Sequence, residues 1–245
     1  MLPEPTRQPA LLAFDTSNET MAIAACGPAG EAGWAGPGGA AASAGLLPRV
    51  HEVLARAGLG LRDLDAVAFG AGPGAFTGLR TACAVAQGLA FGLGCPVLAL
   101  DGLAIVAEGA PWRDGPVWVA MDARMNEIYA AAYHPVEGGW TADPAPALYT
   151  LPALSADWLA APPQRVAGSA IAAFAGRLPF GDAELQPVES DRAAALLRVA
   201  RRAWARGEGI DPALALPMYL RDKVASTTAE RVAERAARSV ASPAA

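Results

Sequence analysis

A glycine-rich segment at residues 70–80, Gly-Ala-Gly-Pro-Gly-Ala-Phe-Thr-Gly-Leu-Arg, has the composition of a loop that binds phosphate. Such loops follow a buried strand and open a helix, whose first backbone N–H groups bind the anion. The side chains that this chemistry requires are missing. Leu79 follows Gly78 where a Walker motif needs lysine, and Ala75 interrupts the dinucleotide pattern. We therefore predict a packing and partner-docking element, in which Arg80 meets either an anion or a neighbouring carboxylate.

Two aspartates, Asp15 and Asp122, end apolar runs in different halves of the chain. Paired carboxylates of this kind can hold a hydrated Mg²⁺ between two lobes, as in nucleotide-cleaving enzymes. An aspartate at a strand end also caps its own turn by accepting hydrogen bonds from nearby amides. Since the two halves do not both carry a phosphate loop, we favour the capping role. An actin-like Mg-ATP-binding phosphotransferase or ATPase that uses both aspartates stays open as the alternative.

Other catalytic and metal-binding patterns are missing from the sequence. The chain has two histidines, His51 and His134, and no G-x-S-x-G segment, which disfavours a Ser-His-Asp hydrolase. Without an HExxH motif or paired cysteines, a metal site would need scattered carboxylates. We therefore expect no catalytic residue, no metal and no cofactor of the chain's own.

The charge and composition limit the partners. A net charge of −5 and a pI near 5.1 argue against a surface that grips a phosphate backbone by itself. The apolar stretch at residues 82–107 is interrupted by glycine, proline and polar residues, so no membrane span is expected. Three cysteines without CxxC spacing and a start without a signal peptide predict a cytoplasmic protein.

The elements that must position these residues alternate along the chain. In the first half we predict strands near residues 11–14, 21–26, 31–35, 65–69 and 96–100, with helices at 46–57 and 76–92. After the proline-rich residues 111–116 we predict strands near 117–121, 128–133, 164–167 and 185–188, with helices at 171–177 and 191–205. Alternating strands and helices indicate an α/β fold with parallel crossovers. The expected lobes are residues 1–112 and 113–223, followed by a peripheral helix and tail at 224–245 that opens on a capping box at Thr227 and Glu230.

The two halves also begin alike. Leu12-Ala-Phe-Asp15 aligns without gaps with Val119-Ala-Met-Asp122, and the alanine-rich residues 21–25 and 128–132 fall at the same offset. This repetition predicts that the two lobes are related.

Small residues follow one side of the glycine-led helix. Gly78, Ala82, Ala86 and Ala90 recur every fourth residue, which allows another helix to approach closely. The amphipathic helix at residues 46–57 is the natural companion, and the spacing suits packing within the chain or between chains. Alternatively, both helices only cover their own sheet.

Together these motifs resemble the TsaB family, formerly called YeaZ. The resemblance rests on several segments that cover most of the chain: Leu12-Ala-Phe-Asp-Thr-Ser17, Leu46-Leu-Pro48, residues 68–80, Val85-Ala-Gln-Gly-Leu-Ala90, Asp122-Ala-Arg124 with Glu127 and Tyr129, and Pro217-Met-Tyr-Leu-Arg221. It implies an actin-like, Hsp70-like (ASKHA) fold, with two related lobes of mixed sheet flanked by helices. The sequence departs from the family at residues 42–44, where a His-Ser/Thr-Gln stretch is common, and at Ala71 and Ala75.

The resemblance further implies a non-catalytic role and a set of partners. Family members pair with TsaD, which transfers the threonylcarbamoyl group to adenosine 37 of tRNA, and the ATPase TsaE joins them. Contact with tRNA is then indirect, a nucleotide is expected only at the interface with partners, and the same helices would also serve a homodimer. The implied docking residues lie on the two helices of the first lobe: Leu46, Leu47, Val50, Leu54, Gly78, Ala82, Val85, Ala86, Leu89 and Ala90.

Overall fold

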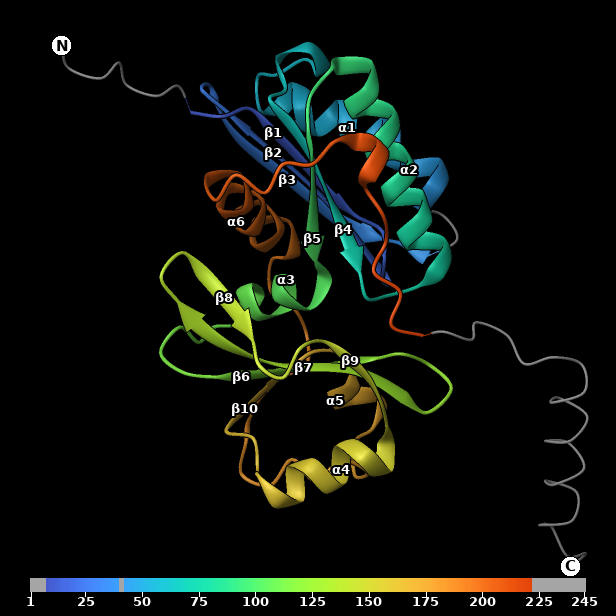
Figure 1. The fold of residues 1–245 in the computed structure, drawn as a ribbon, viewed down its shortest axis with the longest axis vertical. Helices are drawn as coiled ribbons and strands as arrows, with labels where there is room; N and C mark the ends of the chain where they lie inside the picture. Colours follow the sequence, from blue (N-terminus) through green and yellow to red (C-terminus); the bar gives the residue numbers. More distant parts are fainter. Residues whose placement is uncertain (1–7, 40–41, 222–245) are drawn as a thin grey trace, which may run out of the picture.

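Two mixed sheets lie one above the other in the computed structural model, which describes residues 8–39 and 42–221 (Figure 1). The first sheet has the strand order β3-β2-β1-β4-β5. Its strands are β1 (Leu11–Asp15), β2 (Thr20–Gly27), β3 (Gly30–Pro37), β4 (Ala66–Gly72) and β5 (Val97–Asp101). The first three strands pair in antiparallel fashion, whereas β4 and β5 run parallel to β1.

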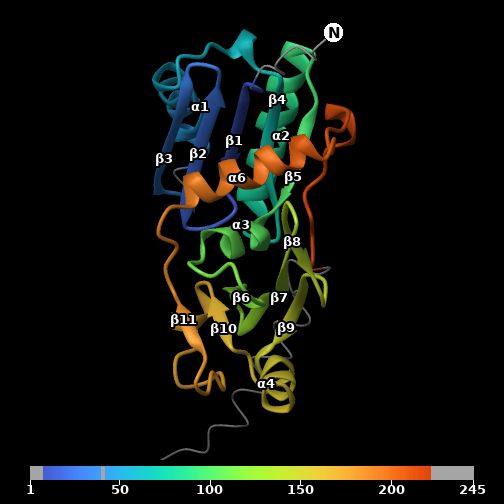
Figure 2. The ribbon, with the colours of Figure 1, turned by 90° about the vertical axis from the view of Figure 1, so that its left-hand side faces the viewer.

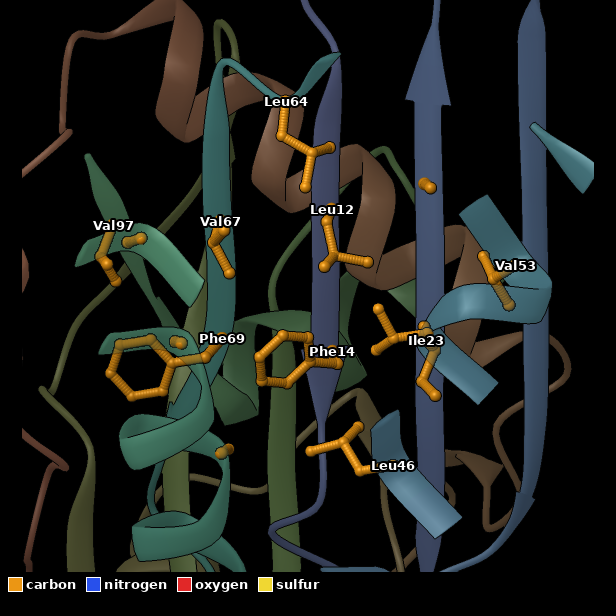
Figure 3. Packing of buried hydrophobic residues seen from close by; sticks show 14 of the residues in the cluster. Leu12, Phe14, Ile23, Leu46, Val53, Leu64, Val67, Phe69 and Val97 are labelled. Atoms are coloured by element: carbon orange, nitrogen blue, oxygen red, sulfur yellow. The ribbon is translucent and has the colours of Figure 1, made fainter. Parts of the chain in front are cut away.

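Helices cover both faces of this sheet, which explains why β1 and β4 are buried along their whole length. α1 (Ala42–Arg56) and α2 (Phe76–Leu93) pack on one face, over Phe14, Ile23 and Phe69 (Figure 3). The other face is covered by α6 (Arg192–Ala205), which crosses the strands in Figure 2. A short 3-10 turn, η2 (Leu61–Asp63), precedes β4.

The second sheet has the order β11-β10-β6-β7-β8, with β9 also paired to β7. Its strands are β6 (Val117–Asp122), β7 (Glu127–Val136), β8 (Gly139–Ala142), β9 (Ala147–Thr150), β10 (Arg165–Ala167) and β11 (Glu184–Gln186). The helices around it are α3 (Gly102–Gly109), α4 (Leu151–Ala160) and α5 (Ala170–Ala173). α3 lies between the two sheets and shares a core with β6 and β7.

The two sheets repeat one topology. In each, an antiparallel three-stranded unit is extended on its first strand by two parallel strands, so β1, β4 and β5 correspond to β6, β10 and β11. The predicted relationship between the lobes is therefore present in the connectivity. Its gapless offset is wrong by one residue in the second strand, because Asp15 pairs with Ala22 and Asp122 pairs with Ile128. The turn of the second lobe is one residue shorter.

The position of α6 shows that the predicted boundary between the lobes is wrong. The sequence assigns residues 113–223 to the second lobe, but α6 packs on β1, β2 and β5 through Ala193, Leu196 and Ala200, and Ile210 pairs with Val97. The amphipathic pattern identified the helix without identifying the sheet that it covers. The first sheet needs this cover because its second face is lined by apolar side chains of β1 and β2. The first lobe is thus built from both ends of the described chain.

The helix predicted from the capping box at Thr227 and the tail at 224–245 lie outside the described residues. In the part of the chain that the structure describes, no helix combines the length and apolar character needed to cross a membrane.

Candidate partner-docking face and interlobe network

The glycine segment packs on the turn that follows β1. The backbone N–H of Ala75 donates to the Ser17 carbonyl at 2.7 Å, and the Thr16 hydroxyl donates to the Gly78 carbonyl at 2.7 Å. A Cβ at Gly78 would overlap the Thr16 carbonyl oxygen, and one at Gly74 would lie 2.5 Å from the Ser17 carbonyl oxygen. These glycines are thus required by close backbone approach, the packing role predicted for the segment.

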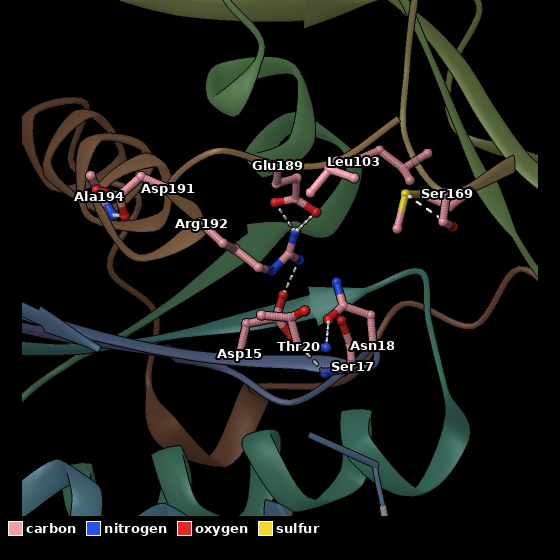
Figure 4. A network of polar contacts seen from close by, with 12 residues as sticks. Asp15, Ser17, Asn18, Thr20, Leu103, Ser169, Glu189, Asp191, Arg192 and Ala194 are labelled. Carbon is pink, nitrogen blue, oxygen red and sulfur yellow. Dashed lines mark hydrogen bonds and ion pairs between the residues drawn. The ribbon is translucent and has the colours of Figure 1, made fainter. Parts of the chain in front are cut away.

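Asp15 lies beneath this turn, fully buried and bonded on both oxygens. Its Oδ1 accepts the Ser17 N–H at 2.7 Å, and its Oδ2 accepts Arg192 Nη2 at 2.5 Å (Figure 4). The Arg192 side chain is 3% exposed and also pairs with Glu189 at 2.6 Å. Burial lowers the pKa of Arg192, but the facing carboxylates outweigh it and hold that pKa above its ordinary value. A cation thus already occupies the position beside Asp15.

Asp122 caps the turn between β6 and β7. Its carboxylate accepts the Arg124 backbone N–H at 2.8 Å and pairs with the Arg124 guanidinium at 3.2 Å. The Asp122 N–H donates to Ser169 Oγ at 3.0 Å. Arg124 also pairs with Glu19 on the facing turn of the first lobe. Both aspartates therefore cap turns, and among the described residues no group of three or more Asp, Glu, His or Cys side chains is arranged to hold a metal.

Hydrogen bonds at two further carboxylates, Glu108 and Asp101, join the lobes. The nearly fully buried carboxylate of Glu108 on α3 accepts hydrogen bonds from Arg198 and Arg202 on α6 and from Trp140 on β8. Burial raises the pKa of Glu108, but these donors outweigh it and hold that pKa below its ordinary value. Tyr133 on β7 donates to Asp101 at the end of β5, at 2.5 Å. These contacts tie α3, α6 and both sheets together.

The structure divides the predicted docking residues by exposure. Six of the ten side chains are at most 2% exposed and pack on the first sheet: Leu46, Val50, Leu54, Ala82, Ala86 and Ala90. The expectation that these six contact a partner is therefore wrong for the folded chain, because the helices use this face to cover their own sheet. Gly78, Val85 and Leu89 are partly buried, whereas Leu47 is 45% exposed.

A second row of small residues on α2 faces outward. Ala84, Gly88 and Gly92 are exposed and, like the buried row, stand four residues apart. A Cβ at Gly88 or Gly92 would meet nothing within 4 Å. Each helical glycine costs about 1 kcal/mol relative to alanine. No contact in the described chain explains that cost.

We call Leu47, Ala84, Gly88, Phe91 and Gly92 the outer face. Phe91 is 59% exposed at the C-terminal end of α2, and Leu47 lies on the neighbouring helix α1. The four-residue spacing that marked the buried row was the signal for this face too. Only the position of the sheet distinguishes the two rows.

The histidines remain apart from nucleophiles. His51 is exposed on α1, and His134 Nε2 lies 3.2 Å from the Asp143 carbonyl oxygen. Within residues 8–39 and 42–221, neither ring forms a hydrogen bond with a serine or cysteine side chain. This geometry gives no base for a hydrolytic nucleophile.

Two lobes of one topology, whose equivalent turns face each other across an arginine-filled junction, define the chain as a protein of the actin-like class. Residues 40–155 match the family model described as "TsaD: tRNA N6-adenosine threonylcarbamoyltransferase". The structure resembles "YeaZ from Pseudomonas aeruginosa" with a TM-score of 0.78 and 38% identity, covering 87% of this chain and 100% of that one. A second solved structure, "an uncharacterized protein with similarity to peptidase YEAZ" from the same organism, gives a TM-score of 0.79 with the same identity and coverage.

Two of the curated relatives share a name. The tRNA threonylcarbamoyladenosine biosynthesis protein TsaB of Escherichia coli is 33% identical over 190 residues, which span 74% of this chain and 80% of the relative. The protein of that name from Haemophilus influenzae is 49% identical over 86 residues, 34% of this chain and 36% of the relative. The chain belongs to the TsaB family.

Proposed function

We propose that this chain is a non-catalytic scaffold and activator, which holds a TsaD subunit in its active arrangement for threonylcarbamoylation of adenosine 37 in tRNA. The names of the relatives support a role in the biosynthesis of threonylcarbamoyladenosine in tRNA. The observation that carries the scaffold role is the outer face, where Gly88 and Gly92 leave the surface of α2 without side chains and where Phe91 of α2 and Leu47 of α1 are exposed. Exposed apolar side chains around small residues suit close packing against a partner helix.

The partner in this proposal is a two-lobed homologue. Since residues 40–155 match a TsaD family model, a TsaD subunit offers helices like α1 and α2 to the outer face. The ATPase TsaE and the tRNA then join through the complex, in the cytoplasm, and any nucleotide sits where the partners meet. The interlobe position of this chain suits a nucleotide poorly, because Arg192 is already paired with Asp15 there. In the absence of TsaD, a second copy of the chain binds the outer face.

The test combines the purified chain with TsaD, tRNA and threonylcarbamoyl-adenylate, with and without TsaE. We expect modification of the tRNA to depend on the chain, and full activity of TsaD alone would overturn the scaffold role. Ala84→Arg on the outer face should abolish association. Ala156→Arg on α4, where the replaced alanine is also exposed but lies in the second lobe, is the matched control and should bind as the wild type does. Equal affinities of the two variants would move the interface elsewhere.

A further inference from the structure

The last described residues run across both lobes. We call residues 210–221 the strap. It begins where Ile210 pairs with Val97 of β5, includes the 3-10 turn η3 (Pro212–Leu214), and descends beside α2 towards the second sheet, as Figure 1 shows. The strap therefore connects the helix that carries the outer face with the other lobe.

The middle of the strap is bound to α2 and to the strand before it. Gln87 Nε2 donates to the carbonyls of Pro212 and Ala215 at 3.0 and 3.2 Å. The N–H of Met218 donates to the Ala71 carbonyl of β4 at 2.7 Å. Ala215 is fully buried, and its carbonyl also accepts from Cys83 Sγ at 3.4 Å. Through Ala215 the strap thus joins the core of the first lobe.

An aromatic clamp holds the strap at the start of α2. The rings of Tyr219 and Phe76 lie 5.4 Å apart. Arg80 places its guanidinium 3.8 Å from the centre of the Phe76 ring and donates to the Tyr219 hydroxyl at 3.1 Å. The sequence predicted that Arg80 meets either an anion or a carboxylate. In the structure it contacts Phe76 and binds Tyr219 of the strap.

The end of the strap holds the turn between β6 and β7. Arg221 Nη2 donates to the Glu127 carboxylate at 2.5 Å and to the Ala123 carbonyl at 2.9 Å. Arg221 and Glu127 are 17% and 29% exposed, so water screens this pair only in part.

The turn itself needs support. Arg124, Met125 and Asn126 all have left-handed backbones, with φ of 63°, 56° and 59°. This conformation is unfavourable for arginine and methionine and better tolerated by asparagine. Arg177 supports the far side of the turn through Asn126 Oδ1, at 3.2 and 3.3 Å. The strap supports the near side. A strained turn persists only while its surroundings impose it.

We propose that the strap couples the β6–β7 turn to α2, so that the turn and the outer face regulate each other. Arg221 is the positioning residue, and it acts on α2 through the strap backbone. Because coupling between two sites is reciprocal, a partner bound at the outer face should also order the turn. The partner half of this inference rests on the proposed function, whereas the coupling within the chain does not.

The first test is amide hydrogen exchange of the full chain. Arg221→Ala should raise exchange of residues 79–87 in α2 by about fivefold or more. Arg221→Lys, which keeps the charge, should restore part of the protection. Arg177→Ala is the comparison variant, because Arg177 contacts the same turn through Asn126 and makes no hydrogen bond with the described residues of the strap, so exchange in α2 should rise less. Unchanged exchange in α2 of the Arg221→Ala variant would overturn the proposal, and an equal rise in the Arg177 variant would show that Arg221 is not the positioning residue.

A second variant tests the route. Gln87→Met removes the two hydrogen bonds to the strap and keeps a side chain of similar length. If the strap transmits the effect, Arg221→Ala should change exchange in α2 far less in the Gln87→Met background than in the wild type. Additive changes would refute transmission along the strap.

The coupling to a bound partner is tested separately, by amide protection and by TsaD affinity. TsaD should protect amides 123–127 in the wild type, and Arg221→Ala should weaken TsaD binding about fivefold although Arg221 lies off the outer face. If the wild type fails to bind TsaD, the proposed function fails while the exchange experiment still decides the coupling. If TsaD binds and residues 123–127 stay unprotected, reciprocal coupling is wrong.

Discussion

Arg192 Nη2 lies 2.5 Å from Asp15 Oδ2, joining two residues that stand 177 positions apart in the sequence. Both side chains are buried, with exposures of 3% and 0%. In a two-lobed fold the carboxylate at this strand end faces the junction between lobes, where Figure 4 shows the guanidinium between Asp15 and Glu189. The pair makes this junction a structural contact.

The first prediction concerns the stability of that pair. Arg192→Met leaves a buried carboxylate without its cation, so the free energy of unfolding should fall by about 3–5 kcal/mol. The double variant Asp15→Asn, Arg192→Met should recover part of the loss, because it removes the buried charge as well. Urea denaturation measures both. A loss below about 1 kcal/mol in the single variant would mean that the pair is not buried in solution.

The second prediction separates the scaffold from the ATP-using alternative. Calorimetry of the isolated chain with Mg-ATP should give no binding that depends on Asp15, because Arg192 and the Ser17 amide already satisfy its carboxylate. Micromolar binding that disappears in Asp15→Asn would instead support the actin-like enzyme. Glu31→Gln, far from the junction on the edge strand β3, serves as the charge-matched control.

The third prediction uses two glycines of α2 with opposite surroundings. Gly88→Ala should stabilise the isolated chain by about 1 kcal/mol, because alanine favours helix and the added methyl meets open space. The same change should weaken TsaD binding, since the methyl stands on the outer face. Gly78→Ala should instead destabilise the chain, because its Cβ overlaps the Thr16 carbonyl. Thermal unfolding measures the changes in stability, and a binding titration measures the affinity for TsaD. A Gly88→Ala variant that binds TsaD with full affinity would exclude Gly88 from the interface.

The two glycines also show what the sequence could not predict, namely which side of α2 faces the sheet. The spacing of small residues predicted helix α2 and its close packing, and both rows on that helix share the same spacing. Which row faces inward depends on the sheet beneath, which a local pattern does not contain. The buried row was therefore assigned to the partner. For the same reason Ala86→Arg, which the sequence alone would suggest as an interface test, should unfold the chain, because Ala86 is fully buried.

The sequence also did not predict which elements far apart in the chain pack together. Hairpins, crossovers and the repeat near Asp15 and Asp122 follow from local alternation and were predicted. The return of α6 to the first sheet was not, because an amphipathic helix fits any apolar sheet face. Strands β8 and β9 were also missed, since they have four residues each, and so was helix α4, which buries only Leu154 and Trp158. The strap motif was seen in the resemblance, but its contacts with both lobes are visible only in three dimensions.

The last prediction concerns acid stability, where two interlobe carboxyls act in opposite directions. The pKa of Glu108 is lowered in the folded chain, so its contribution is complete above its ordinary pKa of 4.5 and is lost as pH falls through the folded pKa. Burial raises the pKa of Asp101, against the hydrogen bonds from Tyr133 and the Leu103 amide, so the folded chain loses stability as pH rises from 3.8 through the folded value.

Urea denaturation between pH 3 and pH 8 should show these two signs. Glu108→Gln should be less stable than the wild type at neutral pH, and the difference should shrink below about pH 4.5 because the wild type then loses its ionised partner for Arg198 and Arg202. Asp101→Asn should gain stability relative to the wild type as pH rises above 3.8, because the amide carries no charge to desolvate. If the differences from the wild type change in the same direction with pH, the assigned environment of at least one carboxyl is wrong.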